Sequence, residues 1–492
     1  MTDTPDSDAQ EMDLLPSGIE GLDTILKGGF LRGGIYLVQG EPGAGKTILG
    51  NQLCFNHAAA GGRALFVTLL AETHARMLMH HRRLAFFDQS SIPHNLSYVS
   101  AFRTLEEEGL TGLLQLLRRE IGRRGVSLLV LDGLTAVRES SRSDLEFKKF
   151  IHGLQAQATL VDCTVFLLSS VLVRPPPPEH TMIDGVVELA SHLFGRRAER
   201  TLEVMKRRGL GYLRGRHSFR ITDAGLVVFP RVEALLGKPA REEPIDGPRL
   251  STCIPALDAM LGGGLLHSST TLLIGPSGCG KTIAGLQFLG GASAEQPGLF
   301  FGFFETPARL HIKTKHLALP IERAIAAGHV EIIWQPMTEG LLDEVGNRLL
   351  EAVLRRRVRR LFLDGIAGLE RLAVEPERVV LFMTAVSNEL RGLGVTALFT
   401  DEADILGPGD LPLGGLRLRE ASGLSDNVVV MRFVELGTRL ERVISVLKVR
   451  DSNFQHRLRG YTIAAGGIAV DADSARAEAI LAEALGQRVR EG

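Results

Sequence analysis

An eight-residue glycine-rich segment occurs twice in this chain, as GEPGAGKT and as GPSGCGKT. Each copy follows a short apolar run that is typical of a buried strand, and both fit the pattern G-x-x-x-x-G-K-[ST]. Such a loop between a strand and a helix directs backbone N–H groups at an anion, and the helix N-terminus adds its dipole. The sequence therefore predicts two phosphate-binding loops.

All residues of these loops are predicted nucleotide contacts. We expect each lysine to reach the β and γ oxygens of ATP and each threonine hydroxyl to ligate Mg²⁺. The first loop comprises Gly40, Glu41, Pro42, Gly43, Ala44, Gly45, Lys46 and Thr47, and the second comprises Gly275, Pro276, Ser277, Gly278, Cys279, Gly280, Lys281 and Thr282.

The two loops belong to a longer internal repeat. Their lysines lie 235 residues apart (281 − 46), and the same offset aligns PSGIEGLDTILKGG with STCIPALDAMLGGG. A repeat of this length predicts two similar domains, each large enough for its own core. We place the domains at residues 14–232 and 249–472, with a disordered acidic N-terminus over 1–13, a linker over 233–248 and a C-terminal helix over 473–492.

After each loop, continuous apolar runs alternate with helical patterns. Strands are predicted at 64–70, 128–131 and 164–169 in the first half and at 299–304, 361–363 and 396–400 in the second. Runs this apolar suit a parallel sheet that helices cover on both faces. Polar and apolar residues alternate at 200–205 and 218–229, which predicts antiparallel edge strands. The expected fold class is α/β, with two tandem P-loop NTPase domains.

In each half an apolar strand ends in an aspartate. Asp132 follows SLLVL, 86 residues after Lys46 (132 − 46), and Asp364 follows RLFL, 83 residues after Lys281 (364 − 281). A carboxylate at this place holds the magnesium shell beside the P-loop threonine. We assign Asp132 and Asp364 to Mg²⁺ through water.

Hydrolysis also needs a group that orients or deprotonates the attacking water. The candidates are Glu72 and Glu305, which lie 26 and 24 residues beyond the P-loop lysines (72 − 46 and 305 − 281) at the ends of the next predicted strands. Either carboxylate could instead interact with the dipole at a helix N-terminus.

A Lys-x-Arg pair closes each half, as Lys206 and Arg208 and as Lys448 and Arg450. Strand alternation places both basic residues of a pair on one face, where they could stabilise charge on a γ-phosphate. A solvated edge strand is the alternative. The sequence shows no obvious role for these residues within their own half.

Composition indicates a cytoplasmic protein. The net charge of −1 gives no global attraction to nucleic acid, and the four cysteines have no metal-ligand spacing. The acidic N-terminus has no export signal, and the sequence lacks an apolar stretch of the roughly 18 residues that a membrane span needs.

This chain resembles the KaiC family over nearly its whole length. The resemblance rests on the two loops, on the opening PSGIEGLD and on the closing TLEVMKRRG…HSFRITDAGLVVFP. The resemblance implies two tandem RecA-like ATPase domains in a hexameric ring with ATP at the subunit boundaries. It further implies that Lys206, Arg208, Lys448 and Arg450 reach a neighbour's nucleotide. Circadian members combine a slow ATPase in the first half with an autokinase and autophosphatase in the second.

The chain also departs from that family. Two adjacent glutamates usually follow the second strand, whereas this chain has Ala71-Glu72 and Phe304-Glu305. The Ser-Thr phosphoacceptor pair aligns with Ser422-Gly423, so Ser422 is the candidate phosphoacceptor. The tail over 473–492 does not resemble the partner-binding tail of the clock proteins. We therefore expect slow ATP turnover and a regulatory protein partner whose identity the sequence does not reveal.

Two other hypotheses compete with a slowly hydrolysing ring. A DNA-handling motor of the RecA type is favoured by the segment 196–220, which has nine Lys/Arg against two Glu, but few aromatic residues interleave there to stack bases. A nucleotide-gated scaffold with little catalysis is favoured by the missing glutamates.

Overall fold

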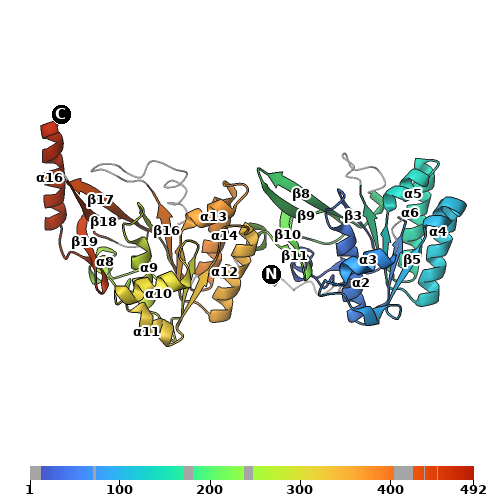
Figure 1. Ribbon diagram of the computed structural model, residues 1–492, viewed down its shortest axis with the longest axis horizontal. Helices are drawn as coiled ribbons and strands as arrows, with labels where there is room; N and C mark the ends of the chain where they lie inside the picture. The colour runs from blue at the N-terminus through green and yellow to red at the C-terminus, as the bar shows by residue number, and fades with distance from the viewer. Residues whose placement is uncertain are drawn as a thin grey trace, which may run out of the picture. The chain divides into compact units, whose positions relative to one another are not determined.

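The computed structural model describes residues 13–69, 74–170, 181–237, 248–403, 425–436, 438–450 and 453–491. Its contacts divide the chain into two compact units, Met1–Ala234 and Leu235–Gly492, which are described one at a time (Figure 1). The division falls inside the short helix α7 (Val232–Leu235), at the start of the segment expected to be a linker.

The described part of the first unit contains a nine-stranded sheet in the order β5-β4-β6-β7-β3-β8-β9-β10-β11. The strands from β5 to β8 are parallel, and β9, β10 and β11 extend the edge as antiparallel strands. A separate pair is formed by β1 (Leu14–Leu15) and β2 (Phe30–Leu31). The strands of the sheet are β3 (Ile35–Gly40), β4 (Ala64–Thr68), β5 (Leu96–Ser100), β6 (Leu128–Asp132), β7 (Thr164–Ser169), β8 (Gly185–Phe194), β9 (Arg197–Arg207), β10 (Arg216–Thr222) and β11 (Gly225–Phe229).

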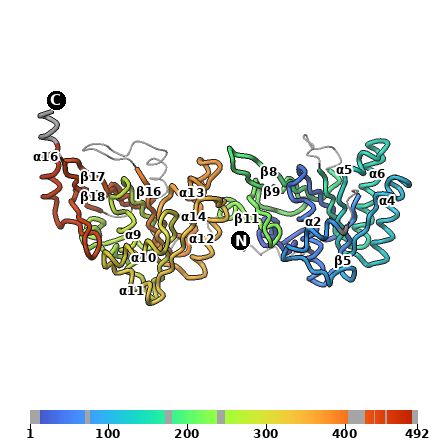
Figure 2. Tube along the Cα trace, in the orientation of Figure 1, coloured from blue at the N-terminus to red at the C-terminus, as the bar shows by residue number. Residues whose placement is uncertain are grey.

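The second unit repeats this order as β14-β13-β15-β16-β12-β17-β18-β19-β20, among its described residues. Figure 2 shows the Cα trace of each unit. The strands of the second unit are β12 (Thr270–Gly275), β13 (Gly298–Gly302), β14 (Val330–Trp334), β15 (Arg360–Asp364), β16 (Thr396–Glu402), β17 (Asn427–Leu436), β18 (Arg439–Val449), β19 (Arg459–Ala464) and β20 (Gly467–Val470). The predicted fold class, a mainly parallel sheet with antiparallel edge strands in each half, is confirmed.

Helices cover both faces of the first sheet (Figure 1). Leu128 and Val130 of β6 pack in one core cluster with α1 and α2, while Leu129 and Leu131 pack in another with α4 and α6. Burial on both faces is the reason that β6 reads as a continuous apolar run. The helices are α1 (Glu20–Ile25), α2 (Lys46–Ala59), α3 (His74–His81), α4 (Phe102–Arg124), α5 (Leu134–Ser140) and α6 (Asp144–Leu160).

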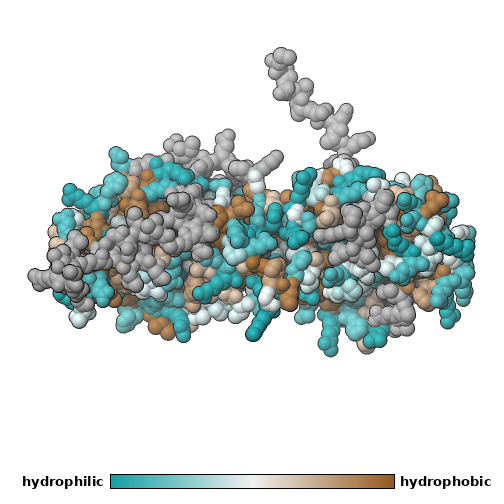
Figure 3. All heavy atoms as spheres, turned by 90° about the horizontal axis from the view of Figure 1, so that it is seen from above, coloured by the Kyte–Doolittle hydropathy of each residue, from teal (hydrophilic) through white to brown (hydrophobic). Residues whose placement is uncertain are grey.

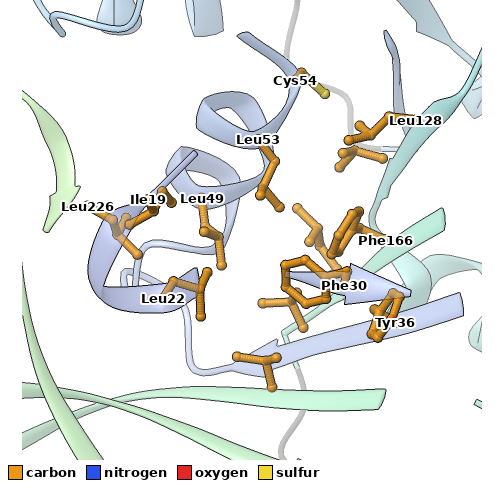
Figure 4. Packing of buried hydrophobic residues seen from close by; sticks show 14 of the residues in the cluster. Ile19, Leu22, Phe30, Tyr36, Leu49, Leu53, Cys54, Leu128, Phe166 and Leu226 are labelled. Carbon is orange, nitrogen blue, oxygen red and sulfur yellow. The ribbon is translucent and has the colours of Figure 1, made fainter. Parts of the chain in front are cut away.

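The core beside the first P-loop is drawn in Figure 4, where side chains of α1 and α2 gather around the aromatic rings of β2 and β7. Phe30 and Phe166 form a T-shaped pair with ring centroids 4.8 Å apart, and Leu22 of α1 is fully buried in the same cluster. Burial of this kind stabilises the fold by about 25 cal/mol per Å² of apolar surface. It anchors α2, and with it the P-loop that precedes α2.

The second unit is built in the same way. One face carries α8 (Pro255–Met260), α9 (Lys281–Gly290), α10 (Pro307–His316) and α11 (Ile321–Ala326), whose buried residues share one core cluster. The other face carries α12 (Leu342–Arg356), α13 (Ile366–Leu372) and α14 (Arg378–Gly392) (Figure 1). The last helix, α16 (Ala475–Glu491), packs Ala477 and Ile480 against Val434 and Val443 of the antiparallel pair β17–β18.

Among the parallel strands that pair at the far edge from the hairpins, β5 and β14 were not predicted. Both lie at the parallel edge of their sheets and bury only part of their length, so neither has the continuous apolar run that marks the central strands.

Among the described residues, none of the helices combines the length and the hydrophobicity of a membrane span. On the face seen in Figure 3, hydrophilic and hydrophobic residues are interspersed over both units.

Candidate nucleotide-binding sites

Each P-loop connects a central strand to a buried helix, β3 to α2 and β12 to α9. The N-caps of these helices are Gly45 and Gly280, at φ 105° and φ 107°. Only glycine adopts this backbone conformation at low cost, and it has no side chain to accept the first helical N–H groups. The sequence thus leaves these donors and the helix dipole available to an anion in both units.

The P-loop lysines make the same contacts in both units. Lys46 Nζ lies 2.7 Å from the carbonyl oxygen of Gly40 and 2.9 Å from that of Glu41. Lys281 Nζ lies 2.6 Å and 2.8 Å from the corresponding oxygens of Gly275 and Pro276. Burial lowers the pKa of Lys46, and the charge of Asp132 opposes that shift. Each ammonium group is therefore held over its own loop.

The threonine of each loop meets the aspartate of the neighbouring strand. Thr47 Oγ1 donates to Asp132 Oδ2 at 2.9 Å, and Thr282 Oγ1 donates to Asp364 Oδ2 at the same distance. A hydroxyl and a carboxylate are oxygen donors of the type that Mg²⁺ takes when it bridges a protein and a phosphate. The donor set in both units therefore fits magnesium.

The second unit contains a pocket of about 390 Å³ over its P-loop. Lys281, Thr282, Asp364 and Glu305 line it. Burial raises the pKa of the Asp364 carboxyl, although hydrogen bonds from Thr400 and Thr282 partly oppose this shift. A cation beside Asp364 would favour its ionised form.

Glu305 lies in this pocket, directly before α10, with its side chain 24% exposed. The helix is capped by Thr306, whose hydroxyl accepts a hydrogen bond from the Arg309 N–H, so Glu305 itself does not cap it. The carboxylate of Glu305 pairs with the ammonium group of Lys313. In the first unit the equivalent candidate, Glu72, lies outside the described residues.

Phe304, which precedes Glu305, also lines the pocket and is 45% exposed. The guanidinium carbon of Arg371 lies 5.6 Å from the centre of its ring. An aromatic side chain can neither orient nor deprotonate water, so of positions 304 and 305 only Glu305 presents a carboxylate to the pocket.

The Lys-x-Arg residues, for which the sequence shows no obvious role within their own half, have partners in their own unit. Lys206 Nζ lies 2.5 Å from the carbonyl oxygen of Ile183, and Arg208 donates to that of Thr181 at 2.9 Å. Both carbonyl groups belong to the segment that precedes β8. The sequence could not show these partners, because they lie more than 20 residues away along the chain.

The second pair is held in the same way. Lys448 Nζ lies 2.8 Å from the carbonyl oxygen of Ser425, and Arg450 pairs with Asp426 at 3.2 Å. Burial lowers the pKa of Lys448 and also that of Lys206. Ser422, the candidate phosphoacceptor, lies outside the described residues.

Sequence reasoning missed four polar residues that line the second pocket: Lys313, Thr400, Asp401 and Glu402. Thr400 Oγ1 donates to Asp364 Oδ1 at 2.9 Å. Thr400, Asp401 and Glu402 lie at the end of the predicted strand 396–400. The neighbouring parallel strand ends in Asp364, so the sequence could have indicated that these three residues lie near the site. Lys313 gave no such signal, since it lies within α10 and not at the end of a strand.

Cys279 of the second loop is fully buried, and burial raises the pKa of its thiol. This thiol is therefore held in its protonated, less nucleophilic form.

Comparison with known proteins agrees with the geometry of both sites. The model of the KaiC ATPase family matches residues 15–233 and again residues 250–475. The circadian clock oscillator protein KaiC of Picosynechococcus sp. is 27% identical over 476 residues, which cover 92% of this chain and 88% of that protein. The KaiC of Nostoc sp. is 26% identical over 471 residues, with 91% and 87% covered.

A third relative, the KaiC of Synechococcus elongatus, is 25% identical over 485 residues, which cover 94% of this chain and 89% of that protein. Both repeats of the family match, and each coincides with one sheet and one P-loop. With its two RecA-like α/β units, this chain belongs to the KaiC ATPase family.

Proposed function

We propose that this protein binds Mg-ATP in both units and hydrolyses it slowly, and that its nucleotide state regulates a protein partner. The observation that carries the proposal is the Thr–Asp hydrogen bond of 2.9 Å beside the P-loop, which occurs in both units. The same geometry occurs in both copies of the internal repeat, at the place where a P-loop ATPase holds its magnesium ion.

Each residue has a distinct role in this proposal. Lys46 and Lys281 bind the β and γ oxygens, while Thr47 and Asp132, and likewise Thr282 and Asp364, hold Mg²⁺. Bound magnesium would neutralise charge that develops on the phosphates. Glu72 and Glu305 orient the attacking water and accept its proton.

Turnover should be slow because Phe304 occupies the place of the first carboxylate in the second unit. Steady-state phosphate release by the purified protein with Mg-ATP tests this, combined with phosphopeptide mapping on the same sample. We expect release of phosphate with no phosphopeptide at Ser422, because Phe304 cannot activate a hydroxyl. Phosphate on Ser422 that is lost in Lys281→Ala would instead show an autokinase, and nucleotide binding without turnover would show a scaffold.

The protein should assemble in a manner that depends on Mg-ATP. The family resemblance implies a hexamer in which Lys206, Arg208, Lys448 and Arg450 reach a neighbour's nucleotide, so these side chains must exchange their present carbonyl and carboxylate partners for phosphate. Multi-angle light scattering with Mg-ATP, with Mg-ADP and without nucleotide measures the mass directly. A monomer under all three conditions would contradict action in trans.

A DNA-handling function has less support. Arg207, at the centre of the basic segment 196–220, is buried and donates to the carbonyl groups of Leu26 and Gly29. Arg208 and Arg216 face carboxylates of the same unit, Asp184 and Glu203. Much of the positive charge of the segment is therefore used within the fold, which leaves less of it for a phosphate backbone.

A further inference from the structure

We propose that Lys313 contacts the γ-phosphate of ATP in the second nucleotide site. Because ADP lacks this phosphate, the contact lets the site distinguish ATP from ADP through a residue of its own unit. In the absence of ATP, Glu305 holds the Lys313 ammonium group. When the site fills with ATP, Lys313 exchanges the carboxylate for the γ-phosphate and releases Glu305. The inference rests on the nucleotide binding proposed above.

The first support is the position of Lys313. It projects from α10 into the pocket that Lys281, Thr282 and Asp364 also line. Its side chain is 31% exposed and pairs with the carboxylate of Glu305. The ammonium group is thus on the pocket wall, beside the residue that we expect to orient the attacking water.

The charges of the pocket give the second support. Four carboxylates line it, on Glu305, Asp364, Asp401 and Glu402, against two ammonium groups, on Lys281 and Lys313. Lys281 is already within hydrogen-bonding distance of two P-loop carbonyl oxygens. Lys313 is the second cation of this lining, and a polyphosphate that enters the pocket meets it together with Lys281.

The exchange is also physically accessible. An ion pair that keeps contact with solvent contributes little to stability, so its ammonium group can change partners. A lysine is a point charge on a flexible stem, which suits such movement. A γ-phosphate has more negative charge than a carboxylate and forms charge-assisted hydrogen bonds of the same kind. ADP lacks that group, so with ADP Lys313 stays on Glu305.

The two units differ at this residue. The segment ETHARMLMH of the first unit aligns with ETPARLHIK of the second, so that Lys313 corresponds to His80. Each residue follows its candidate glutamate by eight positions (313 − 305 and 80 − 72). Contact of this lysine with the γ-phosphate is therefore a property of the second unit alone.

The test measures binding to the second site in full-length protein with Lys46→Ala, which disables the first site. Titrations use the β,γ-imido analogue of ATP and ADP, each with Mg²⁺. Lys313→Met should weaken binding of the imido analogue about 10- to 100-fold, the usual effect of losing a charged hydrogen bond, and change ADP binding less than about threefold. Lys315→Met, two residues further on the exposed side of the same helix, is the matched control and should change neither.

Glu305→Gln should have the opposite effect, since it frees Lys313 and so strengthens binding of the imido analogue relative to ADP. Adding Lys313→Met to Glu305→Gln should still weaken binding of the analogue. If it did not, the effect of Lys313→Met would come from repulsion by the unpaired Glu305, and direct contact would be wrong. An equal effect of Lys313→Met on both nucleotides would also overturn the inference. Failure of the Lys46→Ala parent to bind either nucleotide would instead contradict the proposed function itself.

Discussion

Replacing both Lys46 and Lys281 by alanine is expected to abolish nucleotide binding under conditions where the unaltered protein fills both sites. Each single variant should retain one site per chain. Loss of a charge-assisted phosphate contact costs about 1.5–3 kcal/mol, which weakens each site about 10- to 100-fold. Equilibrium titration with Mg-ATP, read as both stoichiometry and affinity, measures this effect.

The structure makes the expectation specific to these two lysines. Each Nζ lies within 2.9 Å of two loop carbonyl oxygens, so the charge is positioned before the phosphate arrives. Lys149→Ala and Lys315→Ala change exposed lysines on α6 and α10 and serve as controls that keep the same change of net charge. Unchanged affinity in the double Lys46→Ala/Lys281→Ala variant would show that the loops do not bind the nucleotide.

The sequence predicted the P-loops and the strands that end in Asp132 and Asp364 because these features are local. A loop pattern of eight residues and a buried strand each leave a continuous trace in the sequence. The predicted strand at 361–363 differs from β15 by one residue at either end, for instance. Placement of Asp364 beside Thr282 then follows from the order of strands in a parallel sheet.

Contacts between distant segments were not predictable in this way. In the first unit, Arg207 donates to the carbonyl groups of Leu26 and Gly29, whereas in the second unit Arg249 donates to those of Leu261 and Gly264. The two carbonyl pairs correspond in the repeat, but the arginines come from opposite ends of their units. A buried carbonyl group requires a hydrogen-bond donor, and any segment of the chain that lies close enough can supply it.

The Lys313–Glu305 pair was missed for a related reason. The two residues are eight positions apart, and one precedes α10 while the other lies within it. Periodicity places Lys313 on a helix, but only the tertiary packing of that helix brings its side chain to the pocket lining. The sequence indicated the carboxylate because a glutamate at the end of a strand has a recognisable place, and a lysine inside a helix has none.

Replacing both Glu72 and Glu305 by glutamine is expected to lower ATP turnover by about 10²–10⁴-fold, the usual contribution of a positioned general base. Glutamine keeps the size of the side chain but cannot accept the proton of the attacking water. Nucleotide affinity should not fall, because both P-loops stay intact, so the loss appears in kcat. Phosphate release in each single variant assigns the residual turnover to one unit.

The exposed Glu351 on α12 provides a matched control, since Glu351→Gln makes the same chemical change outside the pocket. Turnover should then equal that of the unaltered protein. If the Glu72→Gln/Glu305→Gln variant also kept full turnover, another group would orient the water. Asp401 and Glu402 would be the next candidates, because both line the pocket of the second unit and lie at the end of β16, close to Asp364.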